Sequence, residues 1–277
     1  MPTCFDLSTE GGVAHLVLNR PHSFNSMVRA FWNELPEIVD GLSAAGATRC
    51  LVISSTGRHF SSGMDLSVFA EGGVAAAGAD RATAAEKFRL DVRRLQRSFS
   101  CLEEARFPVV AAVQGGVIGG AVDMTTACDI RYATADAFFQ IQEINIGMTA
   151  DVGTFPRLCK LMPEGMVREL AYTGRRFLAD EALRLGLVNA VFPDAAACTA
   201  HALSVAREIA AKPPVAVTGS KVMITYARDH STADALDYVG VWNASMLSPE
   251  HMGEAMGARA QKRAAAFPDL APLKAEF

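Results

Sequence analysis

A short apolar run followed by a cluster of glycines constrains this chain more than any other stretch. Residues 109–113 read Val-Val-Ala-Ala-Val, which is typical of a buried strand. The glycines that follow are Gly115, Gly116, Gly119 and Gly120. A buried strand that runs into glycines predicts a tight turn where backbone N–H groups can approach a ligand closely.

Three carboxylic acids follow this turn. Asp123 stands among small apolar residues, Glu143 comes twenty residues later, and Asp151 eight residues after that. Carboxylates beside free backbone N–H groups indicate proton transfer next to a developing negative charge. Spacing alone leaves a second interpretation open, a strand-to-helix turn with acids on the surface.

Composition excludes several classes of protein. Of the 277 residues half are hydrophobic and a fifth are charged, which predicts one domain, or one domain with a small C-terminal appendage. The net charge of −4 and the lack of a basic stripe argue against a nucleic-acid partner. No apolar run approaches the about 20 residues of a membrane helix, so we expect no membrane partner.

Localisation and metal binding can also be predicted from the sequence. The six cysteines are scattered without a Cys-x-x-Cys pair, which indicates neither a zinc site nor a disulfide framework. The first residues lack the charged-then-apolar order of a signal peptide. Together these features predict a cytoplasmic protein without a metal.

Strands alternate with helices along the first two thirds of the chain. Apolar runs predict strands at 13–18, 50–53, 109–113 and 188–192. Helical spacing predicts helices at 27–42, where Pro36 should kink or break the helix, and at 86–104. Further helices are expected at 164–173, 179–186, 195–212, 214–228, 232–247 and 249–265. The pattern predicts an α/β fold with a largely parallel sheet, and the small residues at 70–85 a mobile loop or lid.

Six motifs carry a family resemblance. They are Leu18–Pro21 with Asn25–Met27, Phe60–Leu66, Gly115–Asp123, Ala127–Arg131, Phe139–Thr154, and Ala179–Ala182 with Gly186–Val188. In this order they resemble the crotonase (enoyl-CoA hydratase/isomerase) superfamily. Asp151, in Ala150–Thr154, makes the chain most similar to the dienoyl-CoA isomerases, since hydratases usually have a small residue there.

The resemblance implies a fold and an assembly. The expected fold is a crotonase-like spiral of ββα units at residues 1–195, which holds the active site. A helical C-terminal region at 196–277 would make trimer contacts. The expected assembly is a homotrimer, or a hexamer built as a dimer of trimers.

The resemblance also implies a reaction, the conversion of 3,5-dienoyl-CoA to 2,4-dienoyl-CoA in fatty-acid β-oxidation. Glu143 would remove the proton at C2, and Asp151 would deliver one at C6. The backbone N–H groups of Met64 and Gly120 would bind the thioester oxygen. Asp123 matches the second acid of hydratases with one methylene fewer, which leaves a structural role open for it.

The substrate would be an acyl-CoA, with no separate cofactor. Residues matching the family's coenzyme A contacts are Arg20, Phe24, Asn25, Ser26, Ser62, Gly63 and Asp65. Phe24 stands where many relatives have a basic residue, so Arg58 or a lysine of a neighbouring subunit would contact the phosphates. Neither a G-x-G-x-x-G motif nor a P-loop is present, which disfavours a nicotinamide or flavin site. Two alternatives remain: an enoyl-CoA hydratase that uses Asp123 and Glu143, and a non-catalytic acyl-CoA binder.

Overall fold

Two sheets form the centre of the molecule. The computed structural model describes residues 2–68 and 80–273. The larger sheet has the order β1-β2-β3-β4-β6-β9 and the smaller one β5-β7-β8. The strands of the larger sheet are β1 (Phe5–Glu10), β2 (Val13–Leu18), β3 (Cys50–Ser55), β4 (Val109–Val113), β6 (Ile130–Thr134) and β9 (Ala190–Phe192). Those of the smaller sheet are β5 (Gly116–Ile118), β7 (Phe138–Gln140) and β8 (Phe177–Leu178).

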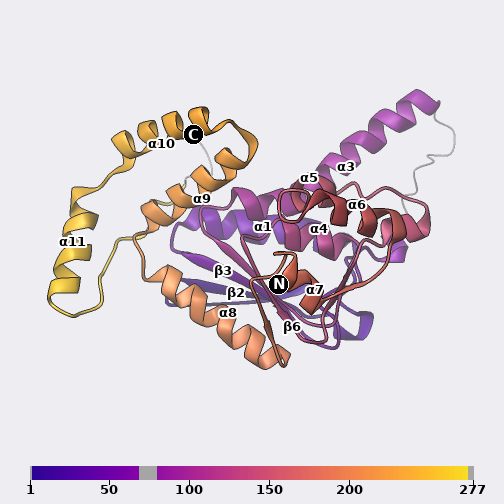
Figure 1. Ribbon diagram of the computed structural model, residues 1–277, viewed down its shortest axis with the longest axis horizontal. Coiled ribbons are helices and arrows are strands. Elements are labelled where there is room, and N and C mark those ends of the chain that lie inside the picture. The colour runs from indigo at the N-terminus through magenta and orange to yellow at the C-terminus, as the bar shows by residue number, and fades with distance from the viewer. Residues whose placement is uncertain (1, 69–79, 274–277) are drawn as a thin grey trace.

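Helices surround these sheets (Figure 1). The N-terminal part contributes α1 (Arg29–Ala45), α3 (Arg81–Glu104), α4 (Gly120–Thr126), α5 (Thr154–Leu158), α6 (Glu164–Thr173) and α7 (Ala179–Arg184). The C-terminal part contributes α8 (Ala195–Ala210), α9 (Pro214–Asp229), α10 (Thr232–Met246) and α11 (Pro249–Ala260). The described residues also form the 3-10 turns η1 (Pro21–Ser23) and η2 (Glu143–Ile146). In the described ranges no helix has the length and apolar character needed to cross a membrane.

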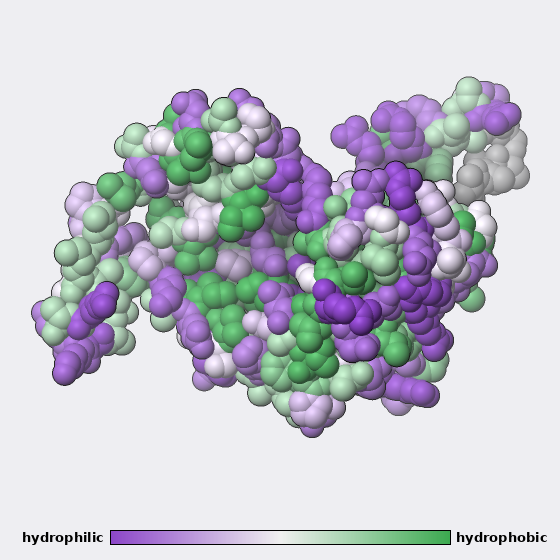
Figure 2. All heavy atoms as spheres, viewed as in Figure 1, coloured by the Kyte–Doolittle hydropathy of each residue, from purple (hydrophilic) through white to green (hydrophobic). Residues whose placement is uncertain are grey.

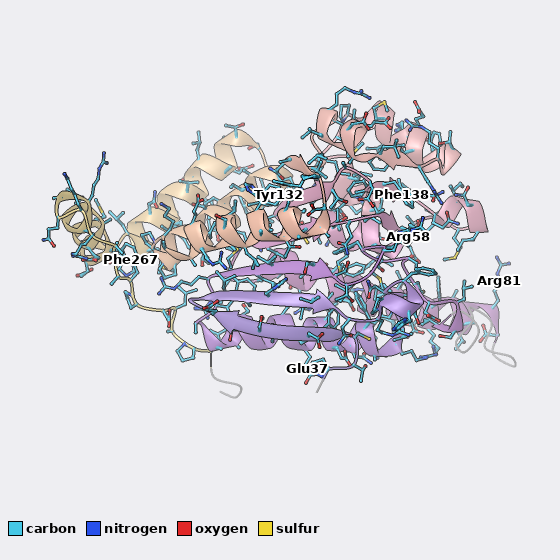
Figure 3. The ribbon with its side chains drawn as sticks, turned by 90° about the horizontal axis from the view of Figure 1, so that it is seen from below. Glu37, Arg58, Arg81, Tyr132, Phe138 and Phe267 are labelled. Atoms are coloured by element: carbon cyan, nitrogen blue, oxygen red, sulfur yellow. The ribbon has the colours of Figure 1, made fainter. Side chains whose placement is uncertain are left out.

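The larger sheet is covered on both faces, which explains its continuous apolar strands. All pairings from β2 to β9 are parallel, and β1 adds an antiparallel edge. Helices α1 and α8 lie on opposite sides of the strands (Figure 3). Helix α8 turns the small side chains of Cys198, Ala202 and Ala206 toward Val52 and Val110. Small residues at this four-residue spacing allow the helix to approach the strands closely.

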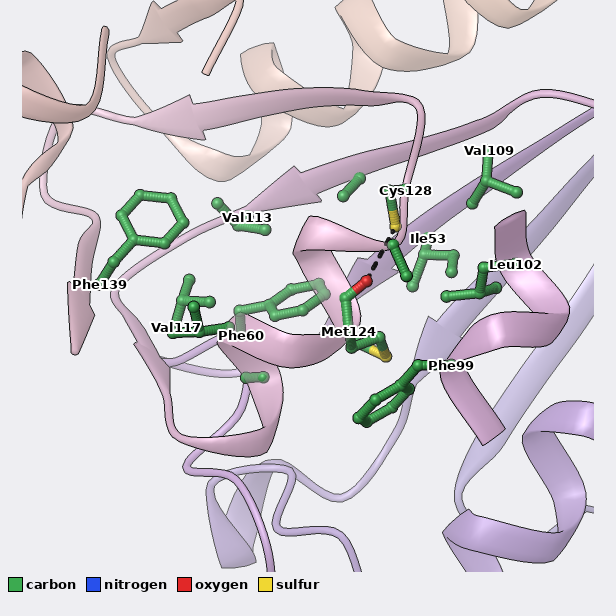
Figure 4. Close-up of a cluster of buried hydrophobic side chains, with 14 of the residues drawn as sticks. Ile53, Phe60, Phe99, Leu102, Val109, Val113, Val117, Met124, Cys128 and Phe139 are labelled. Atoms are coloured by element: carbon green, nitrogen blue, oxygen red, sulfur yellow. Dashed lines mark hydrogen bonds between the residues drawn. The ribbon is translucent and has the colours of Figure 1, made fainter. Parts of the chain in front are cut away.

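Helix α4 is held in the middle of the core. All seven of its residues are buried. Phe60, Phe99 and Met124 belong to the surrounding apolar cluster, and the Cys128 thiol donates to the Met124 carbonyl at 3.5 Å (Figure 4). This burial fixes the position of any polar group that α4 carries.

The predicted strands are present, and helix α1 runs unbroken through Pro36. Proline has no N–H, so the carbonyl four residues earlier, that of Trp32, loses its helical donor. The Ser98 hydroxyl of α3 donates to that carbonyl at 2.8 Å. A side chain from another helix therefore replaces the missing backbone bond.

The boundaries of α3 differ from the prediction. The helix begins at Arg81, where the sequence predicted residue 86, because Asp80 caps it by accepting from the N–H groups of Ala82 and Thr83. The predicted loop at 70–85 is therefore wrong for residues 81–85. Its residues 70–79 lie outside the part of the chain that the structure describes.

The C-terminal helices α9 to α11 form an arm, in which α9 packs on the body and α10 and α11 extend from it (Figure 1). Glu103 of α3 accepts from Arg157 at 2.8 Å and from Arg228 of α9 at 2.6 Å, which ties this arm to the body. The last described residues return to α1, where Leu273 N donates to Ala44 O at 2.8 Å. The division of the chain at residue 195 stays a prediction.

Candidate active site

A cleft of about 1280 Å³ brings most of the predicted site residues together. Its walls come from the start of α1, the middle of α3, the start of α4, and η2 with the loop that follows it. The five predicted catalytic and oxyanion residues all line it: Met64, Gly120, Asp123, Glu143 and Asp151. Segments up to 87 residues apart in the sequence therefore meet at one place.

Two backbone N–H groups face this cleft side by side. Gly63 lets its loop lie against the start of α4, because a Cβ there would meet Ile118 O at 2.5 Å and Gly120 N at 3.2 Å. A Cβ on Gly120 would in turn lie 3.8 Å from Met64 N. Among the described residues neither the Met64 N–H nor the Gly120 N–H donates to an acceptor. Two adjacent free donors suit a carbonyl oxygen that gains negative charge.

Glu143 lies next to these amides at the start of η2. Its Oε1 occupies the space beside Gly119, where a Cβ would approach it to 3.0 Å. Its Oε2 is buried and has no hydrogen-bond partner in the described chain. Burial, and then the charge of Asp123, raise the pKa of Glu143 to about 7. A carboxyl group with this pKa can accept or donate a proton near neutral pH.

Asp123 is the most deeply buried of the three acids, with 1% of the residue exposed. Thr154 donates twice to its Oδ1, from N at 2.6 Å and from Oγ1 at 2.8 Å. Its Oδ2 has no partner among the described residues. Burial raises the pKa of Asp123 to about 6, although the bonds from Thr154 lower it.

Asp151 lines the cleft from the loop before α5. It is half-buried, and this burial raises the pKa of its carboxyl group. The Gln96 side chain of α3 donates to the Asp151 backbone carbonyl at 2.7 Å. Helix α3 therefore fixes the loop that carries this acid.

The residues predicted to bind coenzyme A divide into two groups. Ser26, Ser62 and Asp65 line the cleft. Asp65 accepts from the hydroxyls of Ser26 and Ser67, which lowers its pKa to about 2 and holds it as an anion. These hydrogen bonds suit a structural role for Asp65, which holds the loop around it in place.

The other four residues, Arg20, Phe24, Asn25 and Gly63, are not among those that line the cleft. The buried Asn25 side chain binds the backbone of Arg20, Thr56 and His59. Arg20 donates to the Ser26 carbonyl at 2.6 Å, and the Phe24 ring is 52% exposed. Their predicted contacts with coenzyme A stay predictions.

Sequence reasoning missed the contribution of α3 to the cleft. Lys87, Phe88, Asp91, Val92 and Leu95 all line it. The sequence predicted an amphipathic helix here, but an amphipathic pattern does not distinguish a core face from a cleft wall. The exposed fraction of Phe88, 36%, shows the difference.

Arg176 was also missed. It lines the cleft, and its guanidinium lies 4.2 Å from the centre of the Phe138 ring.

The described residues contain no group of three or more His, Cys, Asp or Glu placed to hold a metal ion.

Comparisons with known proteins agree over nearly the whole chain. Residues 8–269 match the family described as Enoyl-CoA hydratase/isomerase. The mitochondrial Delta(3,5)-Delta(2,4)-dienoyl-CoA isomerase of Rattus norvegicus is 44% identical over 92% of this chain and 79% of its own. The peroxisomal isomerase of Arabidopsis thaliana is 38% identical over 95% of both chains. The crystal structure of enoyl-CoA hydratase from Bacillus anthracis has a TM-score of 0.85, with 26% identity over 96% of this chain and 99% of its own.

These names contradict the predicted cytoplasmic location. The rat relative is named mitochondrial and the Arabidopsis relative peroxisomal. The prediction rested on a few residues at the start of the chain and on scattered cysteines. Neither feature distinguishes the cytosol from other compartments in which thiols stay reduced, so the prediction is wrong.

The similarity extends beyond the motifs to the fold. The solved hydratase covers nearly all of both chains, so the C-terminal helices are included in the match. The matched family model likewise covers both the sheets and most of the helical arm. The chain belongs to the enoyl-CoA hydratase/isomerase family.

Proposed function

We propose that this enzyme isomerises 3,5-dienoyl-CoA to 2,4-dienoyl-CoA in fatty-acid degradation. The observation that carries the proposal is the presence of Glu143 and Asp151 in one cleft with two free backbone N–H groups. The reaction needs a base at C2 and an acid at C6. Relatives named as dienoyl-CoA isomerases support this choice of substrate.

The proposed mechanism needs only groups of the chain. The Met64 and Gly120 N–H groups bind the thioester oxygen and stabilise it as it becomes a dienolate. Glu143 takes the proton from C2, and Asp151 gives a proton to C6. Burial raises the pKa of both acids, and at about 7 the pKa of Glu143 leaves this base ionised in part of the molecules near neutral pH. The acids and amides suffice for the reaction, so we propose that no cofactor takes part.

Hydration of an enoyl-CoA is the alternative. It would need Asp123 and Glu143 to hold one water between them. Asp123 Oδ1 already accepts two bonds from Thr154, and its side chain is short and buried. This geometry favours isomerisation over hydration.

We also propose a homotrimer, or a hexamer of two trimers, that assembles through the C-terminal helices. Large apolar side chains are exposed on α9 to α11: Ile224, Leu236, Val241, Met246, Met252 and Met256. Apolar side chains gather in the hollow between this arm and the body (Figure 2). Exposed apolar area of this kind marks an interface between proteins.

Two substrates test the proposed reaction. Purified enzyme is given 3,5-octadienoyl-CoA, and the conjugated 2,4-dienoyl thioester is followed by absorbance. Crotonyl-CoA hydration is measured in parallel. We expect fast conjugation and slow hydration, and the reverse ratio would establish the hydratase.

The Asp151→Asn substitution tests the role of the second acid. Because asparagine cannot release a proton, conjugation should fall by about 10²–10⁴-fold. Asp180→Asn, which changes an exposed acid at the start of α7, is the control and should keep full activity. Undiminished turnover in Asp151→Asn would remove Asp151 from the mechanism.

A further inference from the structure

We propose that Thr154 is a positioning residue that holds Asp123 as a fixed negative neighbour of Glu143. Thr154 is not among the residues that line the cleft, so it would act on the reaction only through Asp123. In this role Asp123 carries no proton to the substrate. The inference adds to the proposed function a pair of residues, Thr154 and Asp123, that sets the proton affinity of Glu143.

The geometry of the contact supports this role. Thr154 is the first residue of α5 and is 1% exposed. Its N–H and its hydroxyl converge on the same oxygen of Asp123, at 2.6 and 2.8 Å. Two donors on one oxygen fix the plane of the carboxylate. They leave Oδ2 buried and unpartnered within the described chain.

The electrostatic consequence runs from Thr154 to Glu143. Bonds from Thr154 favour the ionised form of Asp123, and the charge of Asp123 raises the pKa of Glu143. The charge of Asp151 raises the pKa of both Asp123 and Glu143, whereas Arg157 of α5 lowers the pKa of Asp123. The other charged residues of the cleft are Arg29, Asp65, Lys87, Asp91, Arg94 and Arg176.

A purely structural role would use the same contact differently. Asp123 could serve only to cap the start of α5, since it accepts the first N–H of that helix. In that case loss of the Thr154 hydroxyl would change stability and leave the titration of Glu143 unchanged. The two roles therefore differ in a measurable quantity.

Four substitutions separate the positioning role from the purely structural one. Thr154→Val keeps the shape of the side chain and removes the hydroxyl, whereas Thr154→Ser keeps the hydroxyl. Thr126→Val is the matched control, because the buried Thr126 hydroxyl bonds the backbone carbonyl of Asp123 at 2.8 Å and not its carboxylate. Asp123→Asn removes the charge itself, and it serves if Thr154→Val does not fold.

The first measurement is a pH titration of the ligand-free protein. It is monitored through the infrared band of protonated glutamate. Labelling with ¹³C-glutamate and comparison with Glu143→Gln assign the band. In Thr154→Val and in Asp123→Asn the midpoint of Glu143 should fall by about half a pH unit or more, because the neighbouring charge is weakened or lost. Thr154→Ser and Thr126→Val should titrate like the wild type.

The second measurement is the pH dependence of kcat/KM for dienoyl-CoA. This part rests on the proposed function. The acidic limb should shift to lower pH in Thr154→Val, with kcat reduced and KM nearly unchanged. An unshifted Glu143 midpoint, or an equal shift in Thr154→Ser, overturns the inference. A shifted midpoint in an enzyme that converts no dienoyl-CoA overturns the proposed function and leaves the inference standing.

Discussion

The position of Glu143 depends on the absence of a side chain at residue 119. Gly119 has a φ of +54°, a region that residues with a Cβ rarely adopt. Its missing side chain leaves the space that Glu143 Oε1 fills. The residue before Gly120, the proposed oxyanion donor, therefore also fixes the place of Glu143, the proposed base.

Replacing this glycine should damage activity more than stability. In Gly119→Ala the new methyl group would lie 3.0 Å from Glu143 Oε1 and displace the carboxylate. We expect turnover to fall by more than about tenfold, because small displacements of a catalytic group are costly. The positive φ should add a loss of about 1–2 kcal/mol in unfolding free energy.

Gly147→Ala is the matched control for this substitution. Gly147 also has a positive φ, +79°, and a Cβ there meets nothing within 4 Å. Its unfolding free energy should fall by a similar amount while turnover stays near that of the wild type. Equal losses of turnover in the two variants would show that strain, and not contact with Glu143, limits activity.

At the scale of elements, α1 and α3 are joined by a bond that Pro36 makes necessary. The Trp32 carbonyl lacks its helical donor, and the Ser98 hydroxyl supplies one at 2.8 Å. Ser98→Ala should therefore leave a buried carbonyl unpaired and cost about 1–3 kcal/mol of unfolding free energy. Denaturant unfolding measures this loss.

A double-mutant cycle isolates the contribution of the proline. In a Pro36→Ala background the restored N–H can bond the Trp32 carbonyl, so Ser98→Ala should cost less than it does in the wild type. Ser220→Ala, which removes an exposed hydroxyl bonded within its own helix, should have equal effects in both backgrounds. An equal cost of Ser98→Ala in both backgrounds would contradict the proposed compensation.

Elements with a strong local pattern could be predicted from the sequence. The apolar runs of β2 and β4 indicated strands correctly, and the spacing of apolar residues indicated α1 and α6. The start of α3 was missed, because its cap is formed by Asp80 outside the apolar pattern. Strands β5, β7 and β8 have only two or three residues, too few to show a period.

The candidate site shows the same limit. Motif matches predicted Met64, Gly120 and the three acids as site residues, and the fold brings them into one cleft. The bonds from Thr154 to Asp123 join residues 31 positions apart, and Gln96 reaches Asp151 across 55 positions. No local pattern encodes such pairs, because they depend on how α3, α4 and α5 pack together.

At the scale of the whole molecule, the buried acids of the cleft make the free energy of unfolding depend on pH. Burial raises the pKa of Glu143 to about 7 and that of Asp123 to about 6. The folded state therefore binds more protons than the unfolded chain between about pH 4 and 7. Their contribution to the unfolding free energy is complete below about pH 4 and is lost as the pH rises through these values. His15 and His59, whose pKa values burial lowers, act in the opposite direction, so the total curve mixes both effects.

The difference between wild type and Glu143→Gln removes the histidine contribution. Glutamine resembles the protonated acid, so the two proteins should be similarly stable at pH 5, where Glu143 is neutral. At pH 8 the wild type holds a buried carboxylate beside Asp123, and the variant should be more stable by about 1–3 kcal/mol. Urea denaturation without acyl-CoA at pH 5, 6, 7 and 8 measures this difference. Glu10→Gln, which changes an exposed acid of β1, is the control substitution at the same four pH values. If the Glu143→Gln difference were constant with pH, Glu143 would not be protonated in the folded protein near pH 5. Its assignment as a base with a proton affinity near neutrality would then fail, even if the enzyme turned over dienoyl-CoA.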